Sequence, residues 1–127
     1  MGLPAAKQGD QIVAVDFHII IPPAAPPVPV PHPFTGIIDG GLSSDVKIMG
    51  MAAATTGTTA TNTPPHIPIG GSFQTPPANR GEIIAGSATV FINGKPAARA
   101  GDTAKTCNDP VDLPVGQVVA VSTVLIG

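Results

Sequence analysis

The chain has 127 residues, of which 43% are hydrophobic and 11% are charged, and its formal net charge is −2. The six Lys and Arg residues are spread along the chain, which argues against a nucleic-acid partner and against a polybasic patch for anionic lipid. Glycine (15) and proline (16) are abundant and aromatic residues make up only 3%. This composition predicts one turn-rich all-β domain over residues 1–127, with a small core.

The first six residues lack the apolar segment of a signal peptide, and no apolar run approaches the roughly 18 residues that a membrane-spanning helix needs. We therefore expect synthesis in the cytoplasm without a signal peptide. Export would follow as part of a larger particle, with delivery outside the cell or into a target cell.

The first long element is predicted at residues 11–21, a strand of mixed alternation that ends where Pro22 and Pro23 remove two amide donors. Seven of the twelve residues from Pro22 to Pro33 are proline, so we expect a polyproline-like insert there. A second repeat then opens at Gly36 and turns at Gly50. The Ala- and Thr-rich stretch that follows favours strand and turn over helix because it is dense in Thr and Gly.

Residues 62–71 and 74–81 are predicted to be loops from their proline and glycine content. The clearest unit is residues 81–102, in which a Thr-Val-Phe-Ile run precedes Asn93-Gly94, a pair suited to a two-residue turn with positive φ at both positions. A loop over 106–114 and closing strands over 118–126 complete the prediction.

The chain contains an internal repeat. When Gly50 is placed on Gly94, residues 46–57 align with residues 90–101 without a gap, and residues 4–10 match residues 96–102. Residues 116–127 resemble residues 81–92, so one copy is split: it begins at the C-terminus and finishes at the N-terminus. We predict a small cone of three β-hairpin repeats with pseudo-threefold symmetry, in which the chain ends meet to complete one repeat.

The histidines and the cysteine are the candidate metal ligands. His18 stands 14 residues after Pro4. His66 stands 14 residues after Ala52, which is the equivalent of Pro4 in the second repeat, and Cys107 lies in the matching loop of the third repeat. The predicted symmetry brings these loops together near the apex of the cone. The full candidate set is His18, His32, His66 and Cys107.

Three imidazoles and one thiolate suit a tetrahedral Zn²⁺ ion, and four protein ligands leave no position for an activated water. Such an ion is structural, and with only one cysteine a metal is the natural staple for so small a core. If Cys107 or His32 were not bound, an open zinc could support hydrolysis. Each residue also has a simple structural interpretation: a strand histidine (His18), loop histidines beside prolines (His32 and His66), and a small buried apolar residue (Cys107).

Enzyme motifs are missing from the sequence. Glu82 is the only glutamate, and no His-Glu-x-x-His or Gly-x-Ser-x-Gly pattern occurs. Asp10 and Asp102 stand at equivalent repeat turns, where we expect them to cap backbone amides. We therefore predict that the protein is not an enzyme.

Pro96-Ala-Ala-Arg99, preceded by Val-Phe-Ile-Asn-Gly and followed by Ala-Gly-Asp, resembles the PAAR family, which caps the spikes of contractile injection systems. The resemblance covers most of the chain. It implies a cone of three β-repeats, a zinc ion held by histidines and a cysteine near the vertex, and a base docked on a trimeric VgrG-type spike. The proline-rich insert is more similar to the tips of phage-tail-like extracellular injection particles than to compact type VI secretion tips.

The resemblance implies a structural tip, one copy per spike trimer, that sharpens the spike, aids membrane puncture and offers a place for effector attachment. The target-cell membrane would be contacted only transiently. Two alternatives remain open. The protein could be a cargo adaptor that holds an effector with the proline-rich loop, or a zinc-dependent hydrolase.

Overall fold

The computed structural model describes residues 2–127 and contains only strands, turns and loops in that range. None of these residues lies in a helix long and apolar enough to cross a membrane. The strands are β1 (Leu3–Pro4), β2 (Gln11–Ile21), β3 (Val28–Gly40), β4 (Lys47–Ile48), β5 (Met51–Ala52), β6 (Thr59–Asn62), β7 (Ser72–Phe73), β8 (Arg80–Ile83), β9 (Phe91–Ile92), β10 (Lys95–Pro96), β11 (Thr103–Thr106), β12 (Leu113–Val119) and β13 (Leu125–Ile126). The all-β prediction is confirmed.

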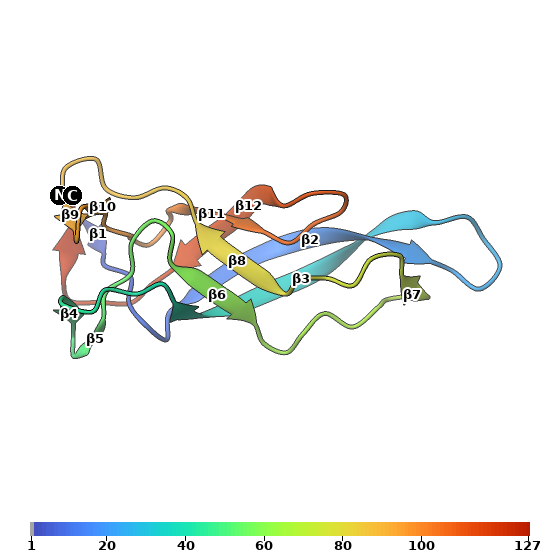
Figure 1. Ribbon diagram of the computed structural model, residues 1–127, viewed down its shortest axis with the longest axis horizontal. Helices are drawn as coiled ribbons and strands as arrows, with labels where there is room; N and C mark the ends of the chain where they lie inside the picture. Colours follow the sequence, from blue (N-terminus) through green and yellow to red (C-terminus); the bar gives the residue numbers. More distant parts are fainter. Residues whose placement is uncertain (1) are drawn as a thin grey trace.

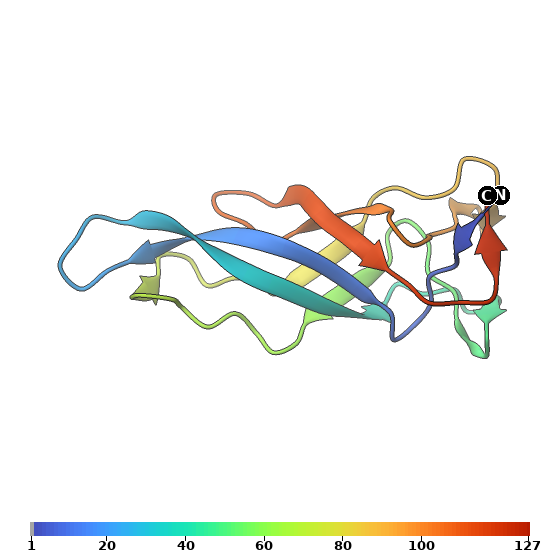
Figure 2. The ribbon, with the colours of Figure 1, turned by 180° about the vertical axis from the view of Figure 1, so that it is seen from behind.

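The body of the molecule is a closed barrel. The strands pair in the order β12-β11-β8-β6-β3-β2, and β12 pairs back with β2 to complete the ring, while β7 adds to the far end of β2. Closure removes the open strand edges that would otherwise invite pairing with other chains. Figures 1 and 2 show that the long β2–β3 hairpin extends beyond the barrel and forms the narrow end of the molecule.

Three short hairpins form the opposite, wide end: β4–β5, β9–β10 and β1–β13. In the last of these, Leu3 pairs with Ile126 and Pro4 pairs with Leu125. Figure 1 places both chain ends beside these hairpins. The prediction that the two ends complete one repeat is therefore confirmed.

Two closed rings of backbone hydrogen bonds join the repeats around the pseudo-threefold axis. The first ring consists of three N–H···O bonds of 2.9 to 3.0 Å: Ala6 donates to Ala98, Ala98 donates to Ala54, and Ala54 donates to Ala6. The second ring also consists of three N–H···O bonds of 2.9 to 3.0 Å and uses neighbouring residues of the same segments. Gln8 donates to Ala52, Thr56 donates to Pro96, and Ala100 donates to Pro4. Within each ring every repeat donates to one neighbour and accepts from the other, and the two rings run in opposite directions around the axis.

The core repeats this symmetry in layers. Near the wide end, three isoleucines and three alanines form one buried cluster: Ile48, Ile92, Ile126, Ala5, Ala53 and Ala97. The next layer contains the three alanines of the first hydrogen-bond ring, all fully buried. Alanine is required there because three backbones that bond directly across the axis leave no room for a larger side chain. This arrangement explains why the chain needs so few aromatic residues.

The proline-rich segment differs from the prediction. Only residues 22–27 form a connecting turn, and residues 28–33 belong to β3, paired with β2 in a continuous register. The prolines at 29, 31 and 33 lie opposite residues 19, 17 and 15 of β2. The carbonyl oxygens of Phe17 and Ile19 accept hydrogen bonds from the backbone amides of Asp109 and Gln74, so they need no N–H donor from Pro31 and Pro29. Proline at every second position is therefore compatible with a strand, and the polyproline-like insert was the wrong prediction for residues 28–33.

The remaining boundaries follow the sequence closely. Strand β2 ends at Ile21, as the double proline predicts, and the Ala- and Thr-rich stretch contains β5 and β6. The last barrel strand starts earlier than expected, at Leu113. Asn93 (φ 53°) and Gly94 (φ 78°) form the predicted two-residue turn, and Met49 (φ 51°) and Gly50 (φ 82°) repeat it.

Gly94→Val tests this turn. No atom lies within 4 Å of a Cβ added at Gly94, so the expected loss of about 1–2 kcal/mol comes from the strain of a β-branched residue at positive φ. Urea and thermal unfolding measure the effect. Gly94→Asn is the matched control, because Asn tolerates this conformation and should be affected less. Equal unfolding of the Val variant and the wild-type protein would contradict the turn.

Candidate metal centre

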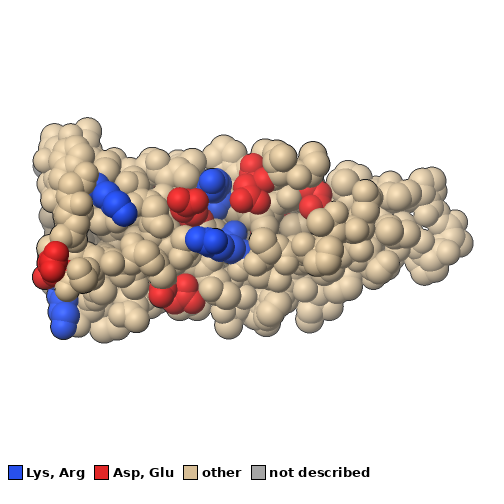
Figure 3. All heavy atoms as spheres, in the orientation of Figure 1, with Lys and Arg blue, Asp and Glu red and all other residues tan. Residues whose placement is uncertain are grey.

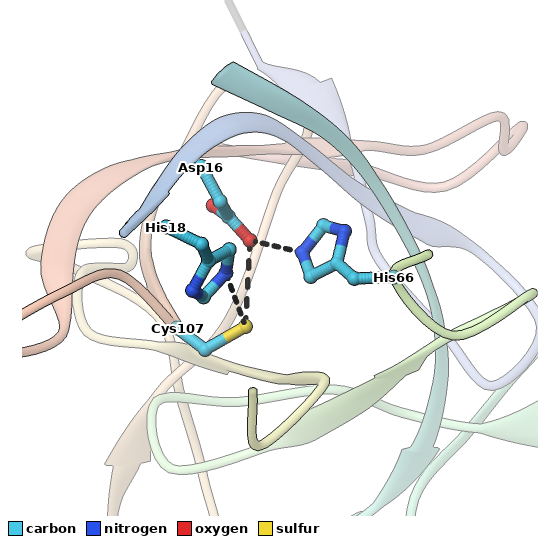
Figure 4. Close-up of side chains that lie close together, drawn as sticks. All are labelled: Asp16, His18, His66 and Cys107. Carbon is cyan, nitrogen blue, oxygen red and sulfur yellow. Dashed lines mark hydrogen bonds and ion pairs between the residues drawn. The ribbon is translucent and has the colours of Figure 1, made fainter. Parts of the chain in front are cut away.

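The candidate ligands converge where the barrel meets the β2–β3 hairpin. His18 lies on β2, where even-numbered residues face inward. His32 lies on β3, His66 lies in the loop after β6, and Cys107 directly follows β11. Three of them belong to one compact group, in which Asp16, His18, His66 and Cys107 each offer a donor atom within 4.8 Å of the others (Figure 4).

The distances within this group are those of polar atoms facing a common point. The Nε2 atom of His66 lies 2.9 Å from Asp16 Oδ2, and Cys107 Sγ lies 3.4 Å from the same oxygen. Cys107 Sγ is also 3.7 Å from Nε2 of His18. Figure 4 shows these donor atoms turned toward one another from separate segments of the chain.

His32 lies beside this group and not within it. Its ring centroid is 5.6 Å from that of His18 and 5.7 Å from that of His66. Its Nδ1 is 2.8 Å from the carbonyl oxygen of Val30, and because a carbonyl can only accept, Nδ1 carries the proton. The lone pair on Nε2 is then buried without a partner. A metal ion would satisfy this nitrogen, so the residues fit the predicted ligand role of His32, which stays a prediction.

His18 also has a buried ring nitrogen without a hydrogen-bond partner. Its Nδ1 has no hydrogen bond within normal limits and lies 3.5 Å from Asp109 Oδ2. That carboxylate is held in place by the backbone amide of Ile19, 2.8 Å from Oδ2. A carboxylate beside the outer nitrogen of an imidazole is a common support for a metal-binding histidine.

Asp16 is the one member of the group that the sequence prediction missed. Its side chain is 0% exposed and accepts hydrogen bonds from Thr106 Oγ1 and from Asn108 Nδ2. The strand pattern could have found it, because Asp16 stands two residues before His18 and alternation puts both on the inner face of β2. The sequence prediction listed only histidine and cysteine as ligands, so it did not include Asp16.

Burial sets the protonation of the metal-free centre. Removal from solvent, followed by the nearby Asp16, raises the pKa of the Cys107 thiol to about 11. Removal from solvent, followed by the nearby His66, lowers the pKa of His18. At neutral pH the thiol is therefore protonated and His18 is neutral, with a lone pair free to bind a cation. A metal that binds here must displace the thiol proton.

A groove of about 310 Å³ lies beside the centre. His32 and Pro33 form one wall, and the segment from Asn62 to Ile67 forms the other, with most of the lining apolar. His32 and His66 are the members of the centre that reach this groove. It is the side from which an ion could approach the donors.

The donor set as a whole favours a borderline metal. Imidazole and thiolate together suit zinc. The buried thiol is protonated and only 3% exposed, so it is poorly placed to act as a nucleophile. The arrangement can hold an ion and join four chain segments around it.

The raised thiol pKa predicts how the metal-free protein responds to alkali. An unfolded cysteine titrates near 9.0 and the folded one near 11, so the stability from keeping the thiol neutral is present below pH 9 and is lost between pH 9 and 11. Urea unfolding in the presence of a chelator should show this loss. The same pH series on Cys107→Ala is the control, because it shows the part of the pH dependence that comes from lysine titration alone. Identical pH profiles for the two proteins would contradict the buried neutral thiol.

Comparison with known proteins agrees with this geometry. A family model described as PAAR motif matches residues 29–105 and 74–127. These two overlapping segments cover well over half of the chain, as expected for a motif that repeats. No curated protein matches the chain. Residues 4–10 lie outside the matched segments, but the hydrogen-bond rings give them the same place as residues 96–102. The chain therefore belongs to the PAAR family, the spike-tip proteins of contractile injection systems.

Proposed function

We propose that this protein caps a trimeric VgrG-type spike as a single copy, with its wide end on the spike and its narrow end leading. The closed rings of hydrogen bonds carry this proposal. A chain that repeats one backbone arrangement three times around an axis can offer a similar contact to each of three identical subunits. It would also cover the strand edges at the end of the spike.

The wide end has the surface that such a contact needs. The three hairpins there carry exposed apolar side chains, among them Met49 (57% exposed), Phe91 (57%) and Leu125 (61%). One such residue stands on each hairpin, so the apolar surface is shared among the three repeats. Exposed apolar groups of this size favour a protein partner.

The narrow end has a different character. Residues 17–38 and 63–79 contain no Asp, Glu, Lys or Arg, and Figure 3 shows a narrow end without charged side chains. A charge-free tip enters a lipid bilayer at a lower desolvation cost than a charged one. This supports a part in membrane puncture, with the protein carried out of its cell on the particle.

The metal centre fits a structural part in this design. We propose that zinc is bound by His18, His32, His66 and Cys107, tying β2, β3 and the loops after β6 and β11 together at the base of the narrow end. Metal binding would then add directly to the stability of a region that has few apolar contacts of its own.

Replacement of a hairpin residue tests the capping proposal. Phe91→Glu should lower affinity for the spike trimer at least about tenfold, because a charge would be buried in an apolar contact. Titration calorimetry measures affinity, and native mass spectrometry should give one chain per trimer for the wild-type protein. Ile67→Glu is the matched control and should bind normally, because this side chain is 72% exposed and belongs to the segment between β6 and β7, which Figure 1 shows away from the three hairpins. A complex of three chains with one trimer would contradict the proposal.

Cys107→Ser tests the structural ion. The change should reduce zinc affinity at least about tenfold and remove the rise in melting temperature that zinc gives the wild-type protein. Elemental analysis and thermal unfolding with and without a chelator provide the measurements. With chelator present, the variant and the wild-type protein should melt alike. Full zinc content in the variant would show that Cys107 is not a ligand.

A further inference from the structure

Asp16 is a buried carboxylate without a permanent cation. Among residues 2–127, the lysine and arginine ion pairs are formed by Asp10, Asp102 and Glu82, while the only basic group in contact with Asp16 is the imidazole of His66. A negative charge with no solvent contact is costly unless a positive charge lies beside it. The fold therefore holds a site where a cation is needed.

The two oxygens of Asp16 have separate surroundings. Oδ1 accepts hydrogen bonds from Thr106 and Asn108, which fix the orientation of the carboxylate. Oδ2 faces His66 and Cys107, and Figure 4 shows it turned toward the same point as their donor atoms. One oxygen is therefore anchored by the protein and the other is directed into the centre.

The position of Oδ2 suits a metal ligand. Two ligand atoms that each lie roughly 2.0 to 2.3 Å from one ion are about 2.8 to 3.8 Å apart when their bonds meet at about 90 to 110°. Cys107 Sγ lies 3.4 Å from Oδ2 and 3.7 Å from His18 Nε2. The 2.9 Å separation between Oδ2 and His66 Nε2 also lies within this range.

The charges of the centre give a second reason. A divalent ion with one thiolate and three neutral imidazoles keeps a net positive charge in a buried site. We propose that Asp16 is a fifth member of the metal centre, contacting the ion through Oδ2 and supplying the negative charge that the other ligands leave unbalanced. This inference rests on the metal centre of the proposed function, and it is independent of spike binding.

Asp16→Asn is the direct test, because it keeps the size of the side chain and removes its charge. Zinc affinity, measured by competition with a chromogenic chelator, should fall about 10- to 100-fold. In cobalt-loaded protein the d–d bands should shift while the thiolate-to-cobalt band persists. Asp102→Asn is the matched control, since Asp102 is also buried but pairs with Arg99 in a repeat turn. Its zinc affinity and cobalt spectrum should stay unchanged.

An Asn variant that binds zinc within twofold of the wild-type protein, with the same cobalt spectrum, would overturn the inference and leave the other ligands standing. A wild-type protein that binds no zinc would refute the metal centre as well. If the variant fails to fold, the wild-type protein labelled with ¹³C-aspartate decides the question. Its infrared carboxylate band should shift when zinc is added, and an unchanged spectrum would overturn the inference.

Discussion

The structure depends on three alanine backbones that bond to one another around a common axis. The cyclic bonds among Ala6, Ala54 and Ala98 fix the distance and rotation between repeats, and everything on either side extends from them. On one side of this ring the three segments turn back as apolar hairpins, and on the other side they continue into the six-stranded barrel. A side chain larger than a methyl group would separate the three backbones and break the ring. The Ala-Ala pairs at 5–6, 53–54 and 97–98 are conspicuous in the sequence because this constraint applies three times.

The barrel carries this symmetry only as far as the metal centre, where the repeats diverge. Equivalent positions hold His18 in the first repeat and His66 in the second, but the third contributes Cys107 from a nearby position. The first repeat also continues into the long β2–β3 hairpin, which brings Asp16 and His32 into opposite positions on paired strands. One chain therefore combines a wide end with threefold-repeated backbone and an irregular narrow end with its own chemistry.

Much of this arrangement could be predicted from the sequence, because short repeats with Gly, Pro and Ala in fixed positions leave few alternatives. The turn at Asn93-Gly94 and the repeat completed by both chain ends followed from local rules and from self-alignment. The start of β3 was not predictable in the same way: proline fits a strand only when the carbonyl opposite it has another donor, and here those donors are the backbone amides of Asp109 and Gln74. Asp16 was missed for a related reason. A carboxylate is expected at the surface until the register places it inside the barrel beside His66 and Cys107.

The pairing of β1 with β13 has a consequence for how the protein is made. A ribosome releases the chain from its N-terminus, so Leu3 and Pro4 emerge long before their partners Leu125 and Ile126. The nascent chain can assemble the other two units first, but this unit stays open until Leu125 and Ile126 have left the exit tunnel. Its closure joins two segments that lie far apart in the sequence, and such non-local contacts form slowly.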